Sequence, residues 1–268
     1  MAIPSFRLDG KTVVVTGVGP GIGAHVAAGY AEAGANLVLC ARRPQGIGEL
    51  AERLAGEGAK ALAVVADVSR PEELNHLVKA AEDSFGSIDV VFNNAHANPA
   101  WSAQEGLEHG LARGELPDKG ALDYSAEDWQ ATFDVNVLAP YRLAQAVVPG
   151  MTERGGGVII NVLSAAAFQP ALPVVAYGTT KAALHMLTRY LAKACAPAVR
   201  VNAICPASIS PDGGVWEAFK AHIPKIPLGR VGIADELVGA ALFLATDASS
   251  FCTGQVIFCD GGRVATVS

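Results

Sequence analysis

Short apolar runs alternate with longer amphipathic stretches along the whole chain, and this alternation limits the fold more than any other feature. The runs are brief, uninterrupted and rich in β-branched residues, which is typical of parallel strands buried on both faces. Because parallel strands need helical connections, the pattern predicts an α/β fold with a mostly parallel sheet of about seven strands and helices on both faces. The expected strands are Thr12–Thr16, Asn36–Cys40, Ala61–Val65, Asp89–Phe92, Val158–Val162, Val199–Ile204 and Gln255–Phe258.

The stretches between these runs have helical periodicity, which is clearest over Gly23–Ala33, Glu72–Phe85, Ala126–Val148 and Ala176–Ala194. No linker, repeat or low-complexity segment divides the chain, so we predict a single dinucleotide-binding domain over residues 1–268. Residues 96–125 carry no strand pattern and exceed an ordinary connection in length. We expect a partly helical flap there, with disorder as the alternative.

Composition narrows the classes of protein. Hydrophobic residues make up 51% of the chain and charged residues 17%, which favours a large buried core, and the net charge of −6 argues against a nucleic-acid or polybasic membrane partner. No apolar stretch reaches the roughly 18 residues of a membrane span, and the start lacks a secretory pattern. Five cysteines without ligand spacing predict reduced thiols and no metal site. We therefore expect a cytoplasmic protein that binds no membrane.

The first strand leads directly into a glycine-rich turn and then a helix. This arrangement offers free backbone N–H groups to a pyrophosphate at the N-terminus of the helix. Ile22 stands where the G-x-G-x-x-G pattern has its last glycine, so an ordinary glycine turn is the alternative; the place in the first strand–helix unit favours a nucleotide site. The candidate residues are Gly17, Gly19, Pro20, Gly21, Ile22 and Gly23.

The second strand ends in two arginines, Arg42 and Arg43. A site selective for NAD places an acidic residue here to bind the ribose 2′-hydroxyl, whereas guanidinium groups suit a 2′-phosphate. The sequence therefore favours NADP(H) over NAD(H), which stays the alternative. Two arginines that only solvate the strand end are the other interpretation.

Ser164, Tyr177 and Lys181 form the third motif. Tyr177 and Lys181 lie one turn apart on the same face of the expected helix. A tyrosine acts as an acid or base at neutral pH when a nearby ammonium favours its phenolate, so the pair predicts an acid–base couple. Ser164 follows an expected strand, from which its hydroxyl can reach a substrate oxygen.

With these motifs the chain resembles the short-chain dehydrogenase/reductase family, in its compact single-domain type, nearly from end to end. Further matching elements are Asp67-Val68, Asn93-Asn94-Ala95, Asn136, Pro206 and the closing Asp260-Gly261-Gly262. The resemblance implies a doubly wound Rossmann fold and hydride transfer between a nicotinamide and a carbonyl or secondary alcohol. It also implies a homo-oligomer, either a dimer or a tetramer.

The resemblance assigns roles to single residues. Tyr177 would exchange a proton with the substrate oxygen that Ser164 positions. Lys181 would hold the nicotinamide ribose and lower the pKa of Tyr177, and Asn136 would anchor a water in the proton relay. The remaining cofactor contacts implied are Asp67 and Val68 beside the adenine, Asn93 and Ala95 near the ribose, and Pro206 and Ile209 after the sixth strand.

Two departures from the family pattern concern the active site. His96 replaces a family glycine and is predicted to point into the mouth of the site, with a packed histidine as the alternative; Pro211 stands where a threonine commonly holds the carboxamide. Aromatic residues near these segments predict a largely apolar alcohol or ketone as substrate. The candidate substrate contacts are His96, Trp101, Phe168 and Trp216.

Two other functions fit part of the sequence. A non-catalytic NADP-binding redox sensor or regulatory module would also carry the glycine turn and the arginines. An enoyl reductase would be expected to space its tyrosine and lysine more widely than Tyr177 and Lys181.

Overall fold

A computed structural model describes residues 5–99, 120–210, 213–215 and 217–265 of the chain. Its centre is a seven-stranded, wholly parallel sheet in the order β3-β2-β1-β4-β5-β6-β9. The strands are β1 (Thr12–Thr16), β2 (Asn36–Ala41), β3 (Lys60–Val65), β4 (Val90–Asn93), β5 (Gly157–Val162), β6 (Val199–Pro206) and β9 (Val256–Cys259). The predicted α/β fold with a parallel sheet is confirmed. Because the strand order reverses between β1 and β4, a crevice is expected at their carboxyl ends.

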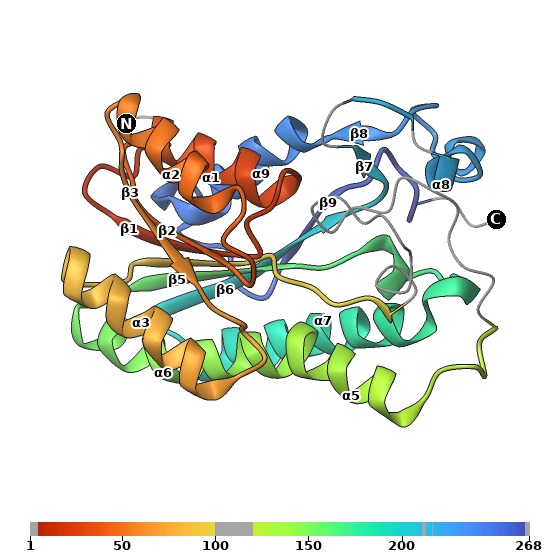
Figure 1. Cartoon of the computed structure of the whole chain (residues 1–268), viewed down its shortest axis with the longest axis horizontal. Coiled ribbons are helices and arrows are strands. Elements are labelled where there is room, and N and C mark those ends of the chain that lie inside the picture. The colour runs from red at the N-terminus through yellow and green to blue at the C-terminus, as the bar shows by residue number, and fades with distance from the viewer. Residues whose placement is uncertain (1–4, 100–119, 211–212, 216, 266–268) are drawn as a thin grey trace.

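Helices cover both faces of the sheet (Figure 1). One face carries α1 (Ile22–Glu32), α2 (Ile47–Gly56) and α9 (Val238–Ala245), and the other carries α3 (Pro71–Phe85), α6 (Ala139–Glu153) and α7 (Val175–Cys195). The first strand shows how one sequence serves both layers. Val13 and Val15 belong to the core beneath α1, whereas Val14 belongs to the core beneath α3. This alternation explains why the strands have no polar face.

Beyond β6 the chain forms a small two-stranded sheet from β7 (Ile209–Ser210) and β8 (Gly232–Ile233), with α8 (Glu217–Lys220) between them. These elements lie near the carboxyl ends of the central strands (Figure 1). Of the flap expected over residues 96–125, residues 100–119 lie outside the described part of the chain. None of the described helices is both long and apolar enough to cross a membrane.

The stretch Ala126–Val148, expected as one helix, contains a change of helical type. α5 (Ala126–Phe133) passes into a π-turn over Asp134–Leu138 before α6 begins. The N–H of Ala139 donates to the carbonyl of Asp134, five residues earlier. Pro140 has no N–H to give to the carbonyl of Asn136, which favours a wider turn at this point. Asn136 is therefore held in the middle of the π-turn, fully buried.

Candidate active site

A cavity of about 1260 Å³ runs along the carboxyl edge of the sheet. The glycine turn and the end of β2 line one part, the end of β5 and the start of α7 line the centre, and segments after β6 and β9 line the far part. The cavity thus lies at the reversal of strand order, where open α/β sheets bind their ligands.

The glycine turn has a backbone shape that only glycine permits at two points. Gly17 has a φ of 68°, and a Cβ there would clash with the backbone of Ala95; a Cβ on Gly23 would lie 2.8 Å from the carbonyl oxygen of Gly17. Asn94 Nδ2 donates to that same oxygen at 2.8 Å, which fixes the turn against the end of β4. The turn is therefore packed tightly against the next strand of the crevice.

The N-terminus of α1 opens onto this turn. Gly21 precedes the helix and makes no side-chain cap, and the first turn carries no acidic residue. The positive end of the helix dipole and its first N–H groups are thus available to an anion. The donor chemistry and the close backbone fit the pyrophosphate of a dinucleotide, which Gly17, Gly21 and Ile22 would hold.

The adenine end is lined by Arg42, Arg43, Asp67 and Val68. Both arginines are exposed, and neither has an ion pair with an acidic residue in the described part of the chain. Asp67 is fixed because its Oδ1 accepts from the N–H of Ser69 at 3.0 Å and from its hydroxyl at 2.7 Å. The four residues that the sequence predicted for this end therefore lie around one space.

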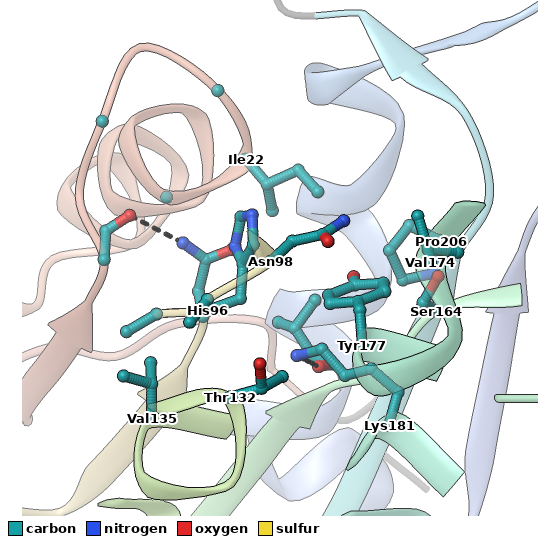
Figure 2. Close-up of a pocket in the computed structure, with 18 of the residues that line it drawn as sticks. Ile22, His96, Asn98, Thr132, Val135, Ser164, Val174, Tyr177, Lys181 and Pro206 are labelled. Carbon is teal, nitrogen blue, oxygen red and sulfur yellow. Dashed lines mark hydrogen bonds between the residues drawn. The ribbon is translucent and has the colours of Figure 1, made fainter. Parts of the chain in front are cut away.

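Ser164, Tyr177 and Lys181 meet in the centre of the cavity (Figure 2). Ser164 follows β5, and its Oγ accepts from the N–H of Ala166 at 3.2 Å, which begins a short 3-10 helix. Tyr177 and Lys181 lie one turn apart in α7. The Lys181 Nζ donates to the carbonyl of Val162 at 2.7 Å and lies 5.6 Å from the centre of the Tyr177 ring.

Burial sets the protonation of this group. It raises the pKa of Tyr177 to about 12, against an opposing hydrogen bond with Ser164, and lowers the pKa of Lys181 to about 7. The direction of this shift is opposite to the lowering by Lys181 that the resemblance implied, because the same surroundings disfavour both the phenolate and the ammonium. At neutral pH Tyr177 is a protonated phenol, which suits proton donation to a carbonyl oxygen.

Asn136 lies behind Ser164, Tyr177 and Lys181 and outside the cavity lining. Its Oδ1 accepts from the N–H of Ala97 at 2.8 Å, and its Nδ2 donates to the Ala97 carbonyl at 3.0 Å and to Thr180 Oγ1 at 2.9 Å. Thr180 Oγ1 in turn donates to the carbonyl of Tyr177 at 2.7 Å. The Asn136 side chain thus connects the segment after β4 with α7.

His96 faces Tyr177 across the cavity (Figure 2), with ring centres 6.0 Å apart and an angle of 68° between the rings. Its position in the site agrees with the sequence prediction. Enclosure by the surrounding protein, with the Lys181 ammonium acting in the same direction, lowers the pKa of His96. The ring remains open to the cavity, so at neutral pH it presents an uncharged imidazole there.

Similarity to known proteins extends over nearly the whole chain. A family model described as Enoyl-(Acyl carrier protein) reductase matches residues 17–263. An uncharacterized oxidoreductase of Mycobacterium tuberculosis (strain CDC 1551) is 35% identical over 268 residues, covering 98% of this chain and 95% of that protein. A short-chain type dehydrogenase/reductase from Mycobacterium marinum has a crystal structure with a TM-score of 0.84 and 34% identity, covering 97% and 98% of the two chains. The chain belongs to the short-chain dehydrogenase/reductase family.

As a member of the short-chain dehydrogenase/reductase family, it is an NAD(P)-dependent oxidoreductase that acts on alcohol and carbonyl groups. A second structure, a gluconate 5-dehydrogenase from Burkholderia cenocepacia J2315 in complex with NADP and tartrate, has a TM-score of 0.82. It is 32% identical and covers 100% of both chains.

Not every predicted contact of this short-chain dehydrogenase/reductase reaches the cavity. Asn93 Nδ2 donates to Asn161 Oδ1 at 2.9 Å beneath the site, and its neighbour Asn94 lines the cavity instead. Phe168 turns away and packs on His185 and Phe258, with ring centres 5.1 and 4.9 Å apart. Trp101 and Trp216 lie outside the described residues, as does Pro211.

The sequence interpretation missed a polar group at the far part of the cavity. We call it the polar end, and its members are Gln169, Ser208, His222 and Arg263. One signal was present, because Arg263 directly follows the closing Asp-Gly-Gly motif at the end of the last strand. Carboxyl ends of parallel strands meet at one edge, so this arginine was placed to reach the site. No group of three metal-ligating side chains occurs in the described part of this protein.

Proposed function

We propose that this short-chain dehydrogenase/reductase uses NADP(H) to interconvert a carbonyl compound and a secondary alcohol whose body is largely apolar. The observation that carries the cofactor choice is the pair Arg42 and Arg43 at the end of β2, where an NAD-selective site has an acidic residue. The NADP of the Burkholderia cenocepacia neighbour supports the same choice.

A nicotinamide held in the cavity would supply or accept the hydride. Tyr177, protonated at neutral pH, donates its proton to the carbonyl oxygen during reduction and accepts it back during oxidation. Ser164 donates a hydrogen bond to the same oxygen and so orients the carbonyl. Lys181, held by the Val162 carbonyl, keeps a cationic group beside the phenol when it is protonated.

The substrate body is inferred from the wall next to Tyr177. This wall is mainly apolar, which suits aliphatic or alicyclic groups better than a polyhydroxylated chain. Its described members are Ala166, Ala171 and Val174. The joint presence of Ser164, Tyr177 and Lys181 at one cavity favours an enzyme over a non-catalytic NADP-binding module. Their one-turn spacing favours carbonyl over enoyl reduction.

A comparison of the two coenzymes tests the proposed use of NADP(H). Reduction of a cyclic ketone such as cyclohexanone is followed with NADPH and with NADH, in the parent and in Arg42→Gln/Arg43→Gln. We expect the KM for NADPH to rise on the order of a hundredfold in the double variant, with the KM for NADH unchanged, because about two charge-assisted contacts to a 2′-phosphate are lost. Equal use of both coenzymes by the parent would overturn the preference.

Assembly is a separate proposal. Large apolar side chains on α6 and α7 are exposed in the single chain, among them Tyr141, Met186 and Tyr190, the last at 69%. We infer that these helices pair between copies in a homodimer or homotetramer. Light scattering of the purified protein checks this, and a monomeric mass at micromolar concentration contradicts it.

A further inference from the structure

The far part of the cavity differs in chemistry from the apolar wall beside Tyr177. Four polar side chains from distant parts of the chain line it, namely those of the polar end. Gln169 follows the 3-10 helix that Ser164 begins, Ser208 lies between β6 and β7, His222 follows α8, and Arg263 follows β9. A substrate held at Ser164 by its carbonyl oxygen thus has a polar, cationic region within the same cavity.

We propose that the polar end is a carboxylate subsite, with Arg263 as its anchoring cation, and that the substrate is accordingly an oxo acid or the corresponding hydroxy acid. This inference rests on the proposed function, because it concerns the other end of the same substrate. In the reduction the carbonyl carbon gains a hydride and its oxygen gains the Tyr177 proton, while the carboxylate takes no part in bond making.

The chain holds Arg263 in a rigid turn. Both oxygens of Asp260 accept backbone N–H groups, Oδ1 from Gly262 at 2.9 Å and Oδ2 from Val264 at 2.7 Å. Gly261 and Gly262 have φ values of 63° and 87°, and a Cβ on Gly261 would lie 2.6 Å from Ile226. The backbone turn that carries the half-buried Arg263 is therefore fixed by these contacts.

A hydrogen bond to Arg263 ties this turn to the catalytic segment. Gln169 Nε2 donates to the Arg263 carbonyl at 3.1 Å. Gln169 lies five residues after Ser164 and just beyond the 3-10 helix Ala165–Ala167. One short, hydrogen-bonded segment thus sets the separation between Ser164 and the backbone of Arg263, which favours selection of substrates by length.

His222 supplies a neutral partner for the same anion. Its Nδ1 lies 2.7 Å from Ser208 Oγ, and Ser208 is 7% exposed. Burial, with Arg263 and Lys225 acting in the same direction, lowers the pKa of His222 to about 4. In the tautomer in which Ser208 donates to Nδ1, the ring carries its proton on Nε2 and can donate it to a carboxylate oxygen.

Acidic side chains on the α5 side of the cavity support an orientation in which the substrate carboxylate lies at the polar end. Glu127, Asp128 and Asp134 line the cavity from α5 and the π-turn. Figure 1 shows α5 and α8 on opposite sides of the carboxyl edge of the sheet. A substrate carboxylate is therefore repelled from the α5 side and attracted to the α8 side.

The test compares acids with their neutral esters. Acetoacetate, 4-oxopentanoate and 5-oxohexanoate are reduced with NADPH beside their methyl esters, in the parent, Arg263→Met and Arg263→Lys. We expect at least one acid to be preferred tenfold or more over its ester. In Arg263→Met its KM should rise on the order of ten- to a hundredfold while ester turnover changes less than about twofold, and Arg263→Lys should recover part of the loss. Arg53→Met, which removes an exposed arginine paired with Glu57 on α2, is the matched control.

Calorimetry separates this proposal from the proposed function. Butyrate, pentanoate and hexanoate are titrated into the parent and into Arg263→Met, each with NADP+ present. Binding to the parent that Arg263→Met loses supports the subsite even if no ketone is reduced. Esters and acids reduced equally well, or an Arg263→Met effect equal for both, would overturn the subsite and leave the oxidoreductase proposal standing. If Arg263→Met does not fold, His222→Phe is expected to weaken the acid selectively, and an unchanged acid-to-ester ratio there would also overturn it.

Discussion

The two ends of the cavity are built in different ways. The phosphate-binding part of the nucleotide end consists mainly of backbone from one continuous segment, in which Gly17 packs on Ala95 and α1 begins at Ile22. The substrate end consists of side chains from separate segments, such as His96 after β4, Tyr177 in α7 and Arg263 after β9. A backbone site recognises what every dinucleotide shares, whereas a side-chain site can change its substrate by single substitutions. The difference explains how one fold keeps its cofactor and varies its chemistry.

The largest effect is expected at the side-chain end. Tyr177→Phe removes the proton donor and leaves the ring that packs in the site. We expect kcat for ketone reduction to fall on the order of 10²- to 10⁴-fold, with the Kd for NADPH changed less than about twofold. Stopped-flow turnover and fluorescence titration measure the two quantities. Tyr190→Phe, on the exposed side of the same helix, serves as control, and a comparable loss there would contradict the assignment.

At the backbone end a single methyl group should have the next largest effect. Gly17→Ala places a Cβ against the backbone of Ala95 at a φ of 68°. We expect the Kd for NADPH to rise on the order of ten- to a hundredfold, because the turn must move away from β4. Gly46→Ala is the matched control, since Gly46 also has a positive φ, 85°, and a Cβ added there would have no atom within 4 Å. Equal losses in both variants would mean that backbone strain alone is responsible.

The lowered pKa of Lys181 predicts that the stability of the fold depends on pH. Its pKa is about 7 in the folded protein and returns to about 10.5 on unfolding. Between these pH values the unfolded chain binds a proton that the folded chain lacks, so the contribution of Lys181 to the free energy of unfolding rises with pH. Below about pH 7 Lys181 is protonated in both states, and the full free-energy cost of burying the ammonium is present. From about pH 7 to pH 9, urea unfolding should show the parent gaining about 2 kcal/mol relative to Lys181→Met.

Between about pH 7 and pH 9, the effect of Lys181 on stability is separate from that of Tyr177. The raised pKa of Tyr177 affects stability only above about pH 10, where the unfolded phenol begins to ionise. Lys193→Met, at an exposed position of α7, should follow the parent across the window. A constant difference between the parent and Lys181→Met would show that the folded pKa is not lowered.

The smallest effect is expected at Phe168. This ring packs on His185 and Phe258 outside the cavity lining. Phe168→Leu should lower the free energy of unfolding by about 1 kcal/mol and change the KM of any substrate less than about twofold. His96→Gly, at the cavity itself, is the comparison variant and should alter substrate KM values by more. A specific KM change in Phe168→Leu would return that residue to the substrate site.

The sequence alone was sufficient to predict the arrangement of residues that lie close together along the chain. Gly17 to Gly23 is one turn into one helix, and Tyr177 and Lys181 are one helical turn apart, so their arrangement follows from local structure. Phe168 was misjudged because it lies close to Ser164 in sequence, but the 3-10 helix between them turns its ring toward α7 and β9.

Two other features depend on contacts that no local pattern contains. The polar end joins segments from β5 to β9, and the raised pKa of Tyr177 reflects burial that only the packed fold creates. The π-turn at Asn136 also interrupts a stretch whose apolar periodicity predicts a single helix.

The close contact of Gly17 with Ala95 has a mechanical consequence. Ala97 lies two residues after Ala95, and Asn136 forms hydrogen bonds with both of its backbone groups. The segment that carries His96 is therefore held by packing against the glycine turn at one end and by hydrogen bonds to the π-turn at the other. The imidazole that faces Tyr177 is therefore positioned by the same short segment against which the glycine turn packs, so the two ends of the cavity share one braced piece of backbone.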